Sequence, residues 1–444
     1  MSLRRNTIFG ALGFLLPTAV VFLAYPAVLR HLGAEQMGVY ILAISLSGSF
    51  AFLEFGLTTV TTKLVAEAVA GGDPDRASDA VVTSTAFYLA LGALGLSVLF
   101  FAAPALARWT GATDTGTATR VFRIAAFLLL STYLNNVAAS VLKGLHRFDL
   151  ATGQAVASSV TSWGGAVAVL AWGGGILSVA GMALASSGLI VLASYAATTA
   201  LCRSRGIRLM RGRPRARMLR GMFRLGIFMS INGLLGVLVN QVQSLVLARL
   251  LTASAVAIWG TAVQIVSKIN ALTSAAFEIV LPVAAELAEH SVRTQARLRM
   301  LRSIYLKALG LSLLFSIAAS GALYVIAPPL IGFWLRSPID ASIVAVLRIL
   351  CIGLAVNGAT PVVFHLLNGI GRPEVNTASM ALGTLILYGT LVALSQDGVT
   401  IERFAIATTV ALVVNGILYF AYAEAVVWRR WLAPGSAAVA TPNA

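Results

Sequence analysis

The residues of this chain that could do chemistry are ionisable side chains inside long apolar stretches. Lys268 lies near the middle of the stretch 256–281, with Gln264 one helical turn before it and Thr261 two turns before it. A charge near mid-membrane costs ~2.5–3.5 kcal/mol on insertion scales, so it is retained where it faces a cavity or a partner. Lys268 is therefore predicted to lie in a water-filled cavity and attract an anion. An interhelical bond that joins the helix bundle is the alternative.

Glu54 is the complementary charge. It lies in the apolar stretch 38–62, where Ser47 and Thr61 would share its face of a continuous helix. We interpret Glu54 as a group that senses an ion gradient. A purely structural ion pair with Lys268 is the alternative.

Four arginines occupy matched positions near the predicted outer ends of helices: Arg30 with Arg249, and Arg123 with Arg348. Guanidinium groups at such positions reach toward lipid headgroups. Together with Lys268 they would also form a cationic path, and guanidinium and ammonium groups bind phosphate well. We therefore include all four among the candidate substrate-binding residues.

Asn232 and Asn240 fall on one face of the apolar stretch 225–248. This pattern is typical of a hydrated helix face that lines a cavity. Polar contacts between packed helices explain it equally well. Both are candidate substrate contacts.

The elements that position these residues are membrane helices. Hydrophobic residues make up 58% of the chain and charged residues 11%, and the mean hydropathy is +0.88. A spanning helix needs about 20 apolar residues, and the chain has twelve such stretches. They are 7–29, 38–62, 80–103, 119–142, 153–173 and 176–201 in the first half, and 225–248, 256–281, 303–326, 341–366, 373–394 and 402–427 in the second.

The second half of the chain repeats the first. At an offset of 219 positions Arg30 falls on Arg249 and Glu67 on Glu286. Further along, at an offset of 225, the segment 142–149 (LKGLHRFD) falls on 367–374 (LNGIGRPE). The sequence therefore predicts an all-α membrane protein of about 12 helices, in two six-helix lobes. Because each half has an even number of helices, the two lobes form a parallel repeat.

Lys and Arg gather on one predicted side of the membrane, which holds 23 of the 32 such residues if both termini are cytoplasmic. The predicted division is 1–202 for the first lobe, 203–224 for a basic cytoplasmic linker, 225–431 for the second lobe and 432–444 for a flexible tail. The net charge of +16 follows from this topology, and the linker is expected to contact anionic lipid headgroups. Nucleic acid is not an expected partner.

Segments 32–40 (LGAEQMGVY), 52–57 (FLEFGL) and 63–67 (KLVAE) resemble short motifs of the multidrug/oligosaccharidyl-lipid/polysaccharide exporter superfamily, within it the polysaccharide (O-antigen type) flippases. Arg147 and Arg372 also resemble that family's G-x-x-(RK) element. The resemblance implies two six-helix lobes around a central cavity, which the stretches 7–29, 38–62, 225–248 and 256–281 would line. It also implies a bacterial inner-membrane flippase that moves an undecaprenyl-diphosphate-linked oligosaccharide by alternating access, with a polysaccharide polymerase or ligase as a potential partner.

Other functions fit the sequence less well. Drug-cation antiporters of the superfamily typically use a carboxylate in the first helix, and residues 6–29 contain none. A peptidoglycan-precursor lipid flippase is a further alternative, although those relatives often carry fourteen helices. Because no histidine or cysteine cluster, phosphate-binding loop or large acidic outer loop occurs, we expect neither an enzyme nor a bound cofactor or metal.

Overall fold

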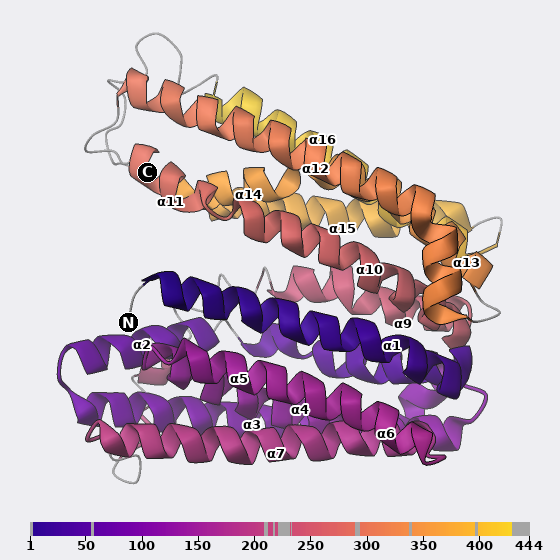
Figure 1. The fold of residues 1–444 in the computed structure, drawn as a ribbon, viewed down its shortest axis with the longest axis horizontal. Coiled ribbons are helices and arrows are strands. Elements are labelled where there is room, and N and C mark those ends of the chain that lie inside the picture. Colours follow the sequence, from indigo (N-terminus) through magenta and orange to yellow (C-terminus); the bar gives the residue numbers. More distant parts are fainter. Residues whose placement is uncertain are drawn as a thin grey trace. The chain divides into compact units, whose positions relative to one another are not determined.

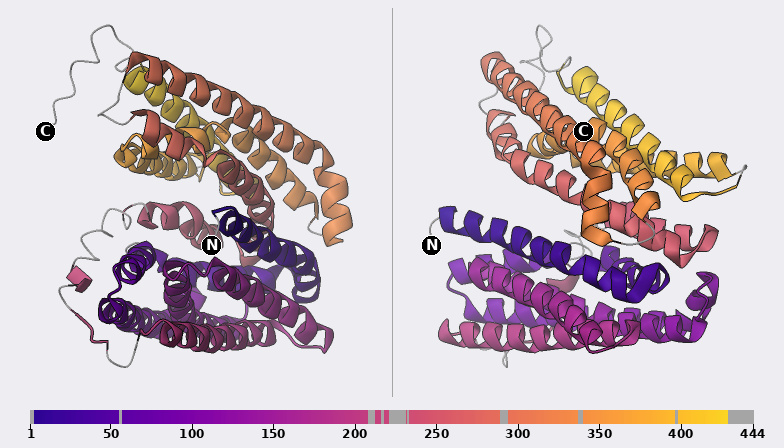
Figure 2. Two further views of the ribbon diagram at one scale, coloured as in Figure 1. Left: turned by 60° about the vertical axis from the view of Figure 1, so that its left-hand side comes forward. Right: turned by 45° about the vertical axis from the view of Figure 1, so that its right-hand side comes forward.

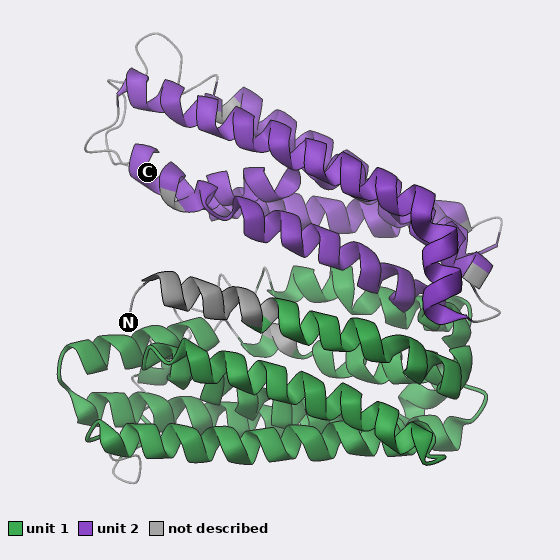
Figure 3. Cartoon of the chain, in the orientation of Figure 1, with its two compact units in different colours: residues 1–257 green, residues 258–444 purple. Residues whose placement is uncertain are grey.

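A computed structural model describes residues 3–54, 57–207, 212–215, 218–220, 231, 233–288, 294–336, 340–395 and 398–428. Within these ranges every regular element is helical, which confirms the predicted all-α fold. The chain divides into two compact units, residues 1–257 and 258–444 (Figure 3). The lobe boundaries drawn from the repeat stay predictions, and the tail 432–444 lies outside the described residues.

Unit 1 is built around three long helices that pack side by side, α3, α4 and α7, with α1 packed on α4, α5 and α9 (Figures 1 and 2). Its elements are α1 (Leu3–Gly48), η1 (Ala51–Glu54), α2 (Leu57–Ala70), α3 (Pro74–Trp109), α4 (Thr115–Gly144), α5 (Phe148–Ser159), η2 (Val160–Gly164), α6 (Gly165–Ala171), α7 (Ile176–Ser204), α9 (Val242–Leu250) and the first turn of α10 (Ala253–Phe277).

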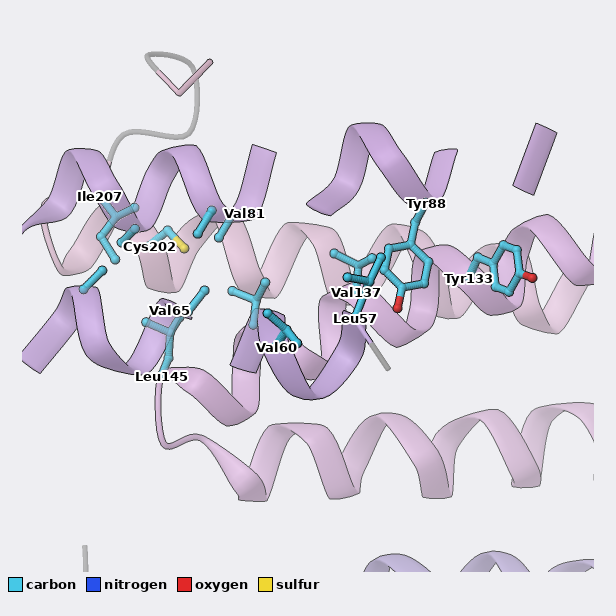
Figure 4. Close-up of a cluster of buried hydrophobic side chains, with 14 of the residues drawn as sticks. Leu57, Val60, Val65, Val81, Tyr88, Tyr133, Val137, Leu145, Cys202 and Ile207 are labelled. Atoms are coloured by element: carbon cyan, nitrogen blue, oxygen red, sulfur yellow. The ribbon is translucent and has the colours of Figure 1, made fainter. Parts of the chain in front are cut away.

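Unit 2 repeats this pattern, because α12 packs on α13, and α13 and α15 pack on α16. Its elements are the remainder of α10, then α11 (Val280–Ala288), α12 (Gln295–Leu335), α13 (Asp340–Asn357), α14 (Thr360–Gly369), α15 (Pro373–Ser395), α16 (Ile401–Tyr422) and η5 (Ala423–Trp428). Each unit has its own buried core, formed by α2, α3 and α4 in unit 1 (Figure 4) and by α11, α12, α14 and α16 in unit 2.

Ten helices of the described chain are long and apolar enough to cross a membrane. The count is two below the twelve predicted spans. The first span and the part of the second up to Gly48 run together in α1, which kinks at Gly33, where φ is 75°. The fifth is divided among α5, η2 and α6.

The repeated glycine of the two matched motifs makes the same close contact in both units. A Cβ atom on Gly144 would lie 2.9 Å from the carbonyl oxygen of Thr62. A Cβ atom on Gly369 would lie 2.5 Å from that of Leu281. The repeat offset relates both pairs, so α4 meets α2 as α14 meets α11.

Replacing Gly144 by Ala is therefore expected to destabilise the fold by about 1–3 kcal/mol, since the added methyl group must push two backbones apart. Gly153, in α5, is the matched control, because a Cβ atom there would meet nothing within 4 Å. Thermal unfolding of the two purified variants in detergent gives the comparison. Equal melting temperatures for the two variants would contradict the packing described here.

Part of the basic linker is packed against the start of α3. The backbone N–H of Arg213 donates to Asp79 at 2.8 Å, and that of Arg215 donates to Thr83 at 3.1 Å. The Arg215 side chain also pairs with the buried Asp79 carboxylate. A Cβ atom on Gly212 would lie 2.6 Å from the hydroxyl oxygen of Ser78. The charge of Arg215, in the predicted linker, is therefore paired with a carboxylate of α3.

Candidate functional site

The predicted continuous helix 38–62 is wrong, because the helix breaks around Glu54. Helix α1 ends at Gly48, a 3-10 turn covers 51–54, and α2 begins at Leu57. At the break the hydroxyl of Ser49 donates to the carbonyl of Ser45 at 2.7 Å, and such bonds compete with helical backbone pairing. Irregular backbone at membrane depth is tolerated where it is buried in protein or lines a cavity.

Helix α4 supplies the groups that support this break. The phenol of Tyr133 donates to the carbonyl of Phe50 at 2.6 Å, and Asn136 Nδ2 donates to Glu54 Oε1 at 2.6 Å. Tyr133 packs edge-on against Tyr88 of α3, with ring centroids 5.7 Å apart (Figure 4). The half-buried Glu54 carboxylate is therefore held in one orientation by a neutral donor.

A second irregular segment faces the first. Residues 160–164 form a π-helical turn, η2, which contributes Ser162 and Trp163. Trp163 packs edge-on against Tyr40 of α1, with ring centroids 6.4 Å apart. Single π-helical turns occur frequently at functional sites.

The two irregular segments help to line a partly open cavity of about 340 Å³ within unit 1. Its lining is rich in hydroxyl and aromatic groups and includes a single carboxylate. The lining residues are Tyr40, Ile44, Ser47, Gly48, Glu54, Leu128, Leu129, Thr132, Tyr133, Ser158, Ser162, Trp163, Ala183 and Ser187. We refer to it below as the Glu54 pocket.

Lys268 lies on α10, fifteen residues after Ala253 and nine before Phe277. It is thus nearer one helix end than the sequence pattern indicated. The side chain is half-buried, as is Gln264 one turn earlier. Among the described residues Lys268 has no hydrogen-bond or ion-pair partner. Lys268 belongs to unit 2 and Glu54 to unit 1, so an ion pair between them stays a prediction.

The four candidate arginines fall into two structural classes. Arg123 lies over the ring of Phe100 at 4.8 Å, and Arg348 lies over Tyr324 at 5.0 Å, each on a neighbouring helix of its own unit. Arg348 Nε also donates to the carbonyl of Tyr324 at 3.2 Å. Stacking occupies one face of each guanidinium group, so the terminal N–H groups at its edge can still donate hydrogen bonds.

Arg30 and Arg249, in contrast, are exposed. Arg30 Nε donates to the carbonyl of Pro26 one turn earlier, at 3.3 Å. Asn240 is also exposed, and its amide donates to its own helix, to Gly236 at 2.8 Å. Asn232 lies outside the described residues.

Sequence reasoning missed most of the Glu54 pocket. Tyr133, Asn136 and Trp163 were not singled out, because none of them is charged. The serine-rich run 158–162 directly before Trp163 is the signal that could have found them, since an apolar span seldom carries so many hydroxyl groups on every face.

The loop after α4 contains the arginine of the predicted G-x-x-(RK) element. Arg147 binds Asp149 through two N–H groups, Nε at 2.9 Å and Nη2 at 2.8 Å. These hydrogen bonds lower the pKa of the Asp149 carboxyl. Forked pairing of this kind fixes geometry as well as charge, so the arginine shapes the turn between α4 and α5.

Long apolar helices in two repeated sets, with polar groups carried into the membrane, define a multi-pass membrane protein. The family model described as "Polysaccharide biosynthesis protein" matches residues 3–288, which is more than half of the chain. This chain belongs to that family. A Shigella flexneri protein described as an O-antigen transporter is 19% identical over 425 residues, covering 94% of this chain and 97% of that protein.

Solved structures show the same fold. An inward-facing multidrug resistance MATE family transporter of the MOP superfamily aligns with a TM-score of 0.78 at 18% identity, over 93% of this chain and 97% of that one. A MOP superfamily transporter from Pyrococcus furiosus, titled for the reverse polarity of its binding pocket, aligns with a TM-score of 0.52 at 19% identity, over 96% and 93%. The family match confirms the predicted polysaccharide branch, and the solved structures confirm the predicted helical fold.

Proposed function

We propose that this chain is a flippase of the bacterial inner membrane. It moves an undecaprenyl-diphosphate-linked oligosaccharide from the inner to the outer leaflet for surface polysaccharide synthesis, with both of its own termini in the cytoplasm. Membership of the polysaccharide family and the repeated helical organisation support this proposal. The lipid tail stays in the bilayer during the movement, and only the diphosphate and the sugars need shelter.

The observation that carries the proposal is that Lys268 has no partner among the described residues. An ammonium group on a membrane helix is retained where it has a partner or faces water. A diphosphate is the anion that every lipid-linked glycan of this kind carries. Arg30, Arg249, Arg123 and Arg348 are proposed to guide it, with Gln264, Asn232 and Asn240 as polar contacts.

Alternating access by the two repeats is the proposed mechanism. Glu54 is the proposed ion-coupling group, because it is the one carboxylate among the residues that line its pocket. Membrane lipids surround the protein, and a polysaccharide polymerase or ligase would receive the product.

Deletion of the gene in its host tests the proposal. Lipid-linked glycan should accumulate on the inner leaflet while surface polysaccharide is lost, and the wild-type gene should restore both. Chemical analysis of the trapped lipid then identifies the sugars. Unchanged surface glycan in the deletion strain would overturn the proposal.

A cation antiporter is the second candidate, and the Glu54 pocket is the observation that favours it, because a carboxylate among aromatic rings attracts organic cations. The same deletion strain separates the two functions, since loss of an antiporter raises sensitivity to cationic dyes and leaves surface glycan intact. Accumulation of a peptidoglycan precursor in its place would identify the third candidate, a peptidoglycan-precursor lipid flippase.

A further inference from the structure

The Glu54 pocket is too large for a bare ion, and hydroxyl groups and one carboxylate interrupt its mostly apolar lining. Its volume of about 340 Å³ lies in the range of small-molecule sites, roughly 300–1,000 Å³, whereas one water molecule occupies about 30 Å³. Ser, Thr and Tyr hydroxyl groups line it from α1, α4, α5, η2 and α7. A ligand that fits this pocket must offer hydrogen-bonding groups as well as apolar surface, because buried polar groups need partners.

Three of the hydroxyl groups are fixed as hydrogen-bond acceptors. Ser47 donates its hydrogen to the carbonyl of Ala125 at 2.8 Å, and Thr132 donates to that of Leu128 at 2.8 Å. Tyr133 donates to a carbonyl in the helix break. Since a hydroxyl group has one hydrogen, these three oxygens offer only lone pairs to the pocket. Together with the Glu54 carboxylate they form an acceptor wall.

Three other lining residues, from α5 and η2, offer donors. Ser158 and Ser162 make no side-chain hydrogen bond to the described residues, so their hydroxyl groups are free to donate. The indole of Trp163 adds one N–H and an aromatic face. A polyol, whose every hydroxyl both donates and accepts, satisfies both sets at once.

The charge of the pocket limits the ligand further. Neither Lys nor Arg occurs among its lining residues, and Glu54 is the one charged group. A phosphate or a uronic acid placed there would face a carboxylate of the same sign without a compensating cation. Neutral sugars and amino sugars meet no such repulsion.

We propose that the Glu54 pocket binds one neutral or amino-sugar unit of the carried glycan and rejects acidic sugars. The inference rests on the proposed flippase function and assigns the diphosphate to the cationic groups and the sugar to this pocket. A sugar hydroxyl donates to the ionised carboxylate of Glu54. Protonation of that carboxylate turns one of its two acceptor oxygens into a donor and removes the charge, so it weakens this hydrogen bond.

Binding to the purified full-length chain in nanodiscs tests the inference. The probes are undecaprenyl diphosphate alone, the same lipid with one N-acetylglucosamine, and the same lipid with one glucuronic acid. We expect the wild-type chain to bind the N-acetylglucosamine lipid about tenfold more tightly than either other probe, as one charge-assisted hydrogen bond allows. Glu54→Gln should remove the discrimination against glucuronic acid. It should leave the affinity for undecaprenyl diphosphate unchanged.

Glu54→Gln keeps an oxygen that can accept from Asn136, so the variant should fold as the wild type does. Ser162→Leu, which fills the pocket, should reduce binding of the N-acetylglucosamine lipid to the level of undecaprenyl diphosphate. Glu374→Gln is the matched control, because Glu374 lines a separate and mostly apolar cavity of about 350 Å³ in unit 2. That control should bind all three probes as the wild type does.

The outcomes separate this inference from the flippase proposal. A wild-type chain that binds all three probes equally would overturn the sugar site and leave the flippase function standing. A wild-type chain that binds none of them would overturn both. Loss of tetraphenylphosphonium binding in Glu54→Gln, with unchanged sugar discrimination, would assign the pocket to an organic cation and contradict the inference.

Discussion

The Lys268→Ala variant should lose glycan translocation and keep its stability. Removal of the ammonium group removes a charge-assisted contact to the diphosphate, which lowers substrate affinity by about 10- to 100-fold. The folded protein loses no ion pair with any described residue. Because the half-buried ammonium group faces a water-filled cavity in this proposal, the variant should unfold at about the same temperature as the wild type.

Proteoliposomes that contain the lipid-linked glycan from the deletion strain give the translocation rate, and thermal unfolding in detergent gives the stability. Lys268→Arg keeps a cation at the same place and should retain much of the transport. Lys307→Ala is the control, because Lys307 is an exposed residue of α12, and it should change neither measurement. Full transport by Lys268→Ala would remove Lys268 from the site, and lowered stability would reveal a structural partner.

The helices that cross the membrane could be predicted from the sequence because the bilayer acts on every residue of a span. Apolar side chains are required over about 20 positions, so the pattern is local and readable. The motif around Gly144 and Gly369 was likewise readable, since it recurs at a fixed offset. In both units the glycine permits the same backbone contact between two helices.

The helix break at Glu54 could not be predicted, because distant residues stabilise it. Phe50 is held by Tyr133, which lies 83 positions further along the chain, and Glu54 is held by Asn136, 82 positions away. The local sequence of the break, with Gly48 and Ser49 in an apolar run, is compatible with a continuous membrane helix. Only the packing of α4 against this segment decides between the two.

The arginine contacts were only partly predictable. Matched positions for Arg123 and Arg348 follow from the repeat, and so does the presence of an aromatic residue on the preceding helix, Phe100 in one unit and Tyr324 in the other. That both guanidinium groups stack on these rings depends on how two neighbouring helices are rotated about their axes, which no spacing within a single helix defines.

Gly38→Ala should have the largest effect on folding among the glycine variants. A Cβ atom on Gly38 would overlap the backbone carbonyl of Ala253, so α1 and the start of α10 are in contact through their main chains. A methyl group there cannot be accommodated by rotating a side chain, and both backbones must move. The cost is on the order of 3 kcal/mol or more, and the yield of folded protein should fall.

The same substitution should also weaken the sugar site. Tyr40, Ile44 and Ser47 follow Gly38 within two to three turns of α1 and line the Glu54 pocket, so a displaced α1 changes the position of its acceptor wall. Gly181→Ala in α7 is the control, because a Cβ atom there meets nothing within 4 Å. Gly38→Ala should lower both the melting temperature and the affinity for the N-acetylglucosamine lipid, whereas Gly181→Ala should lower neither. Wild-type behaviour of Gly38→Ala in both measurements would show that α1 and α10 are not held in this main-chain contact.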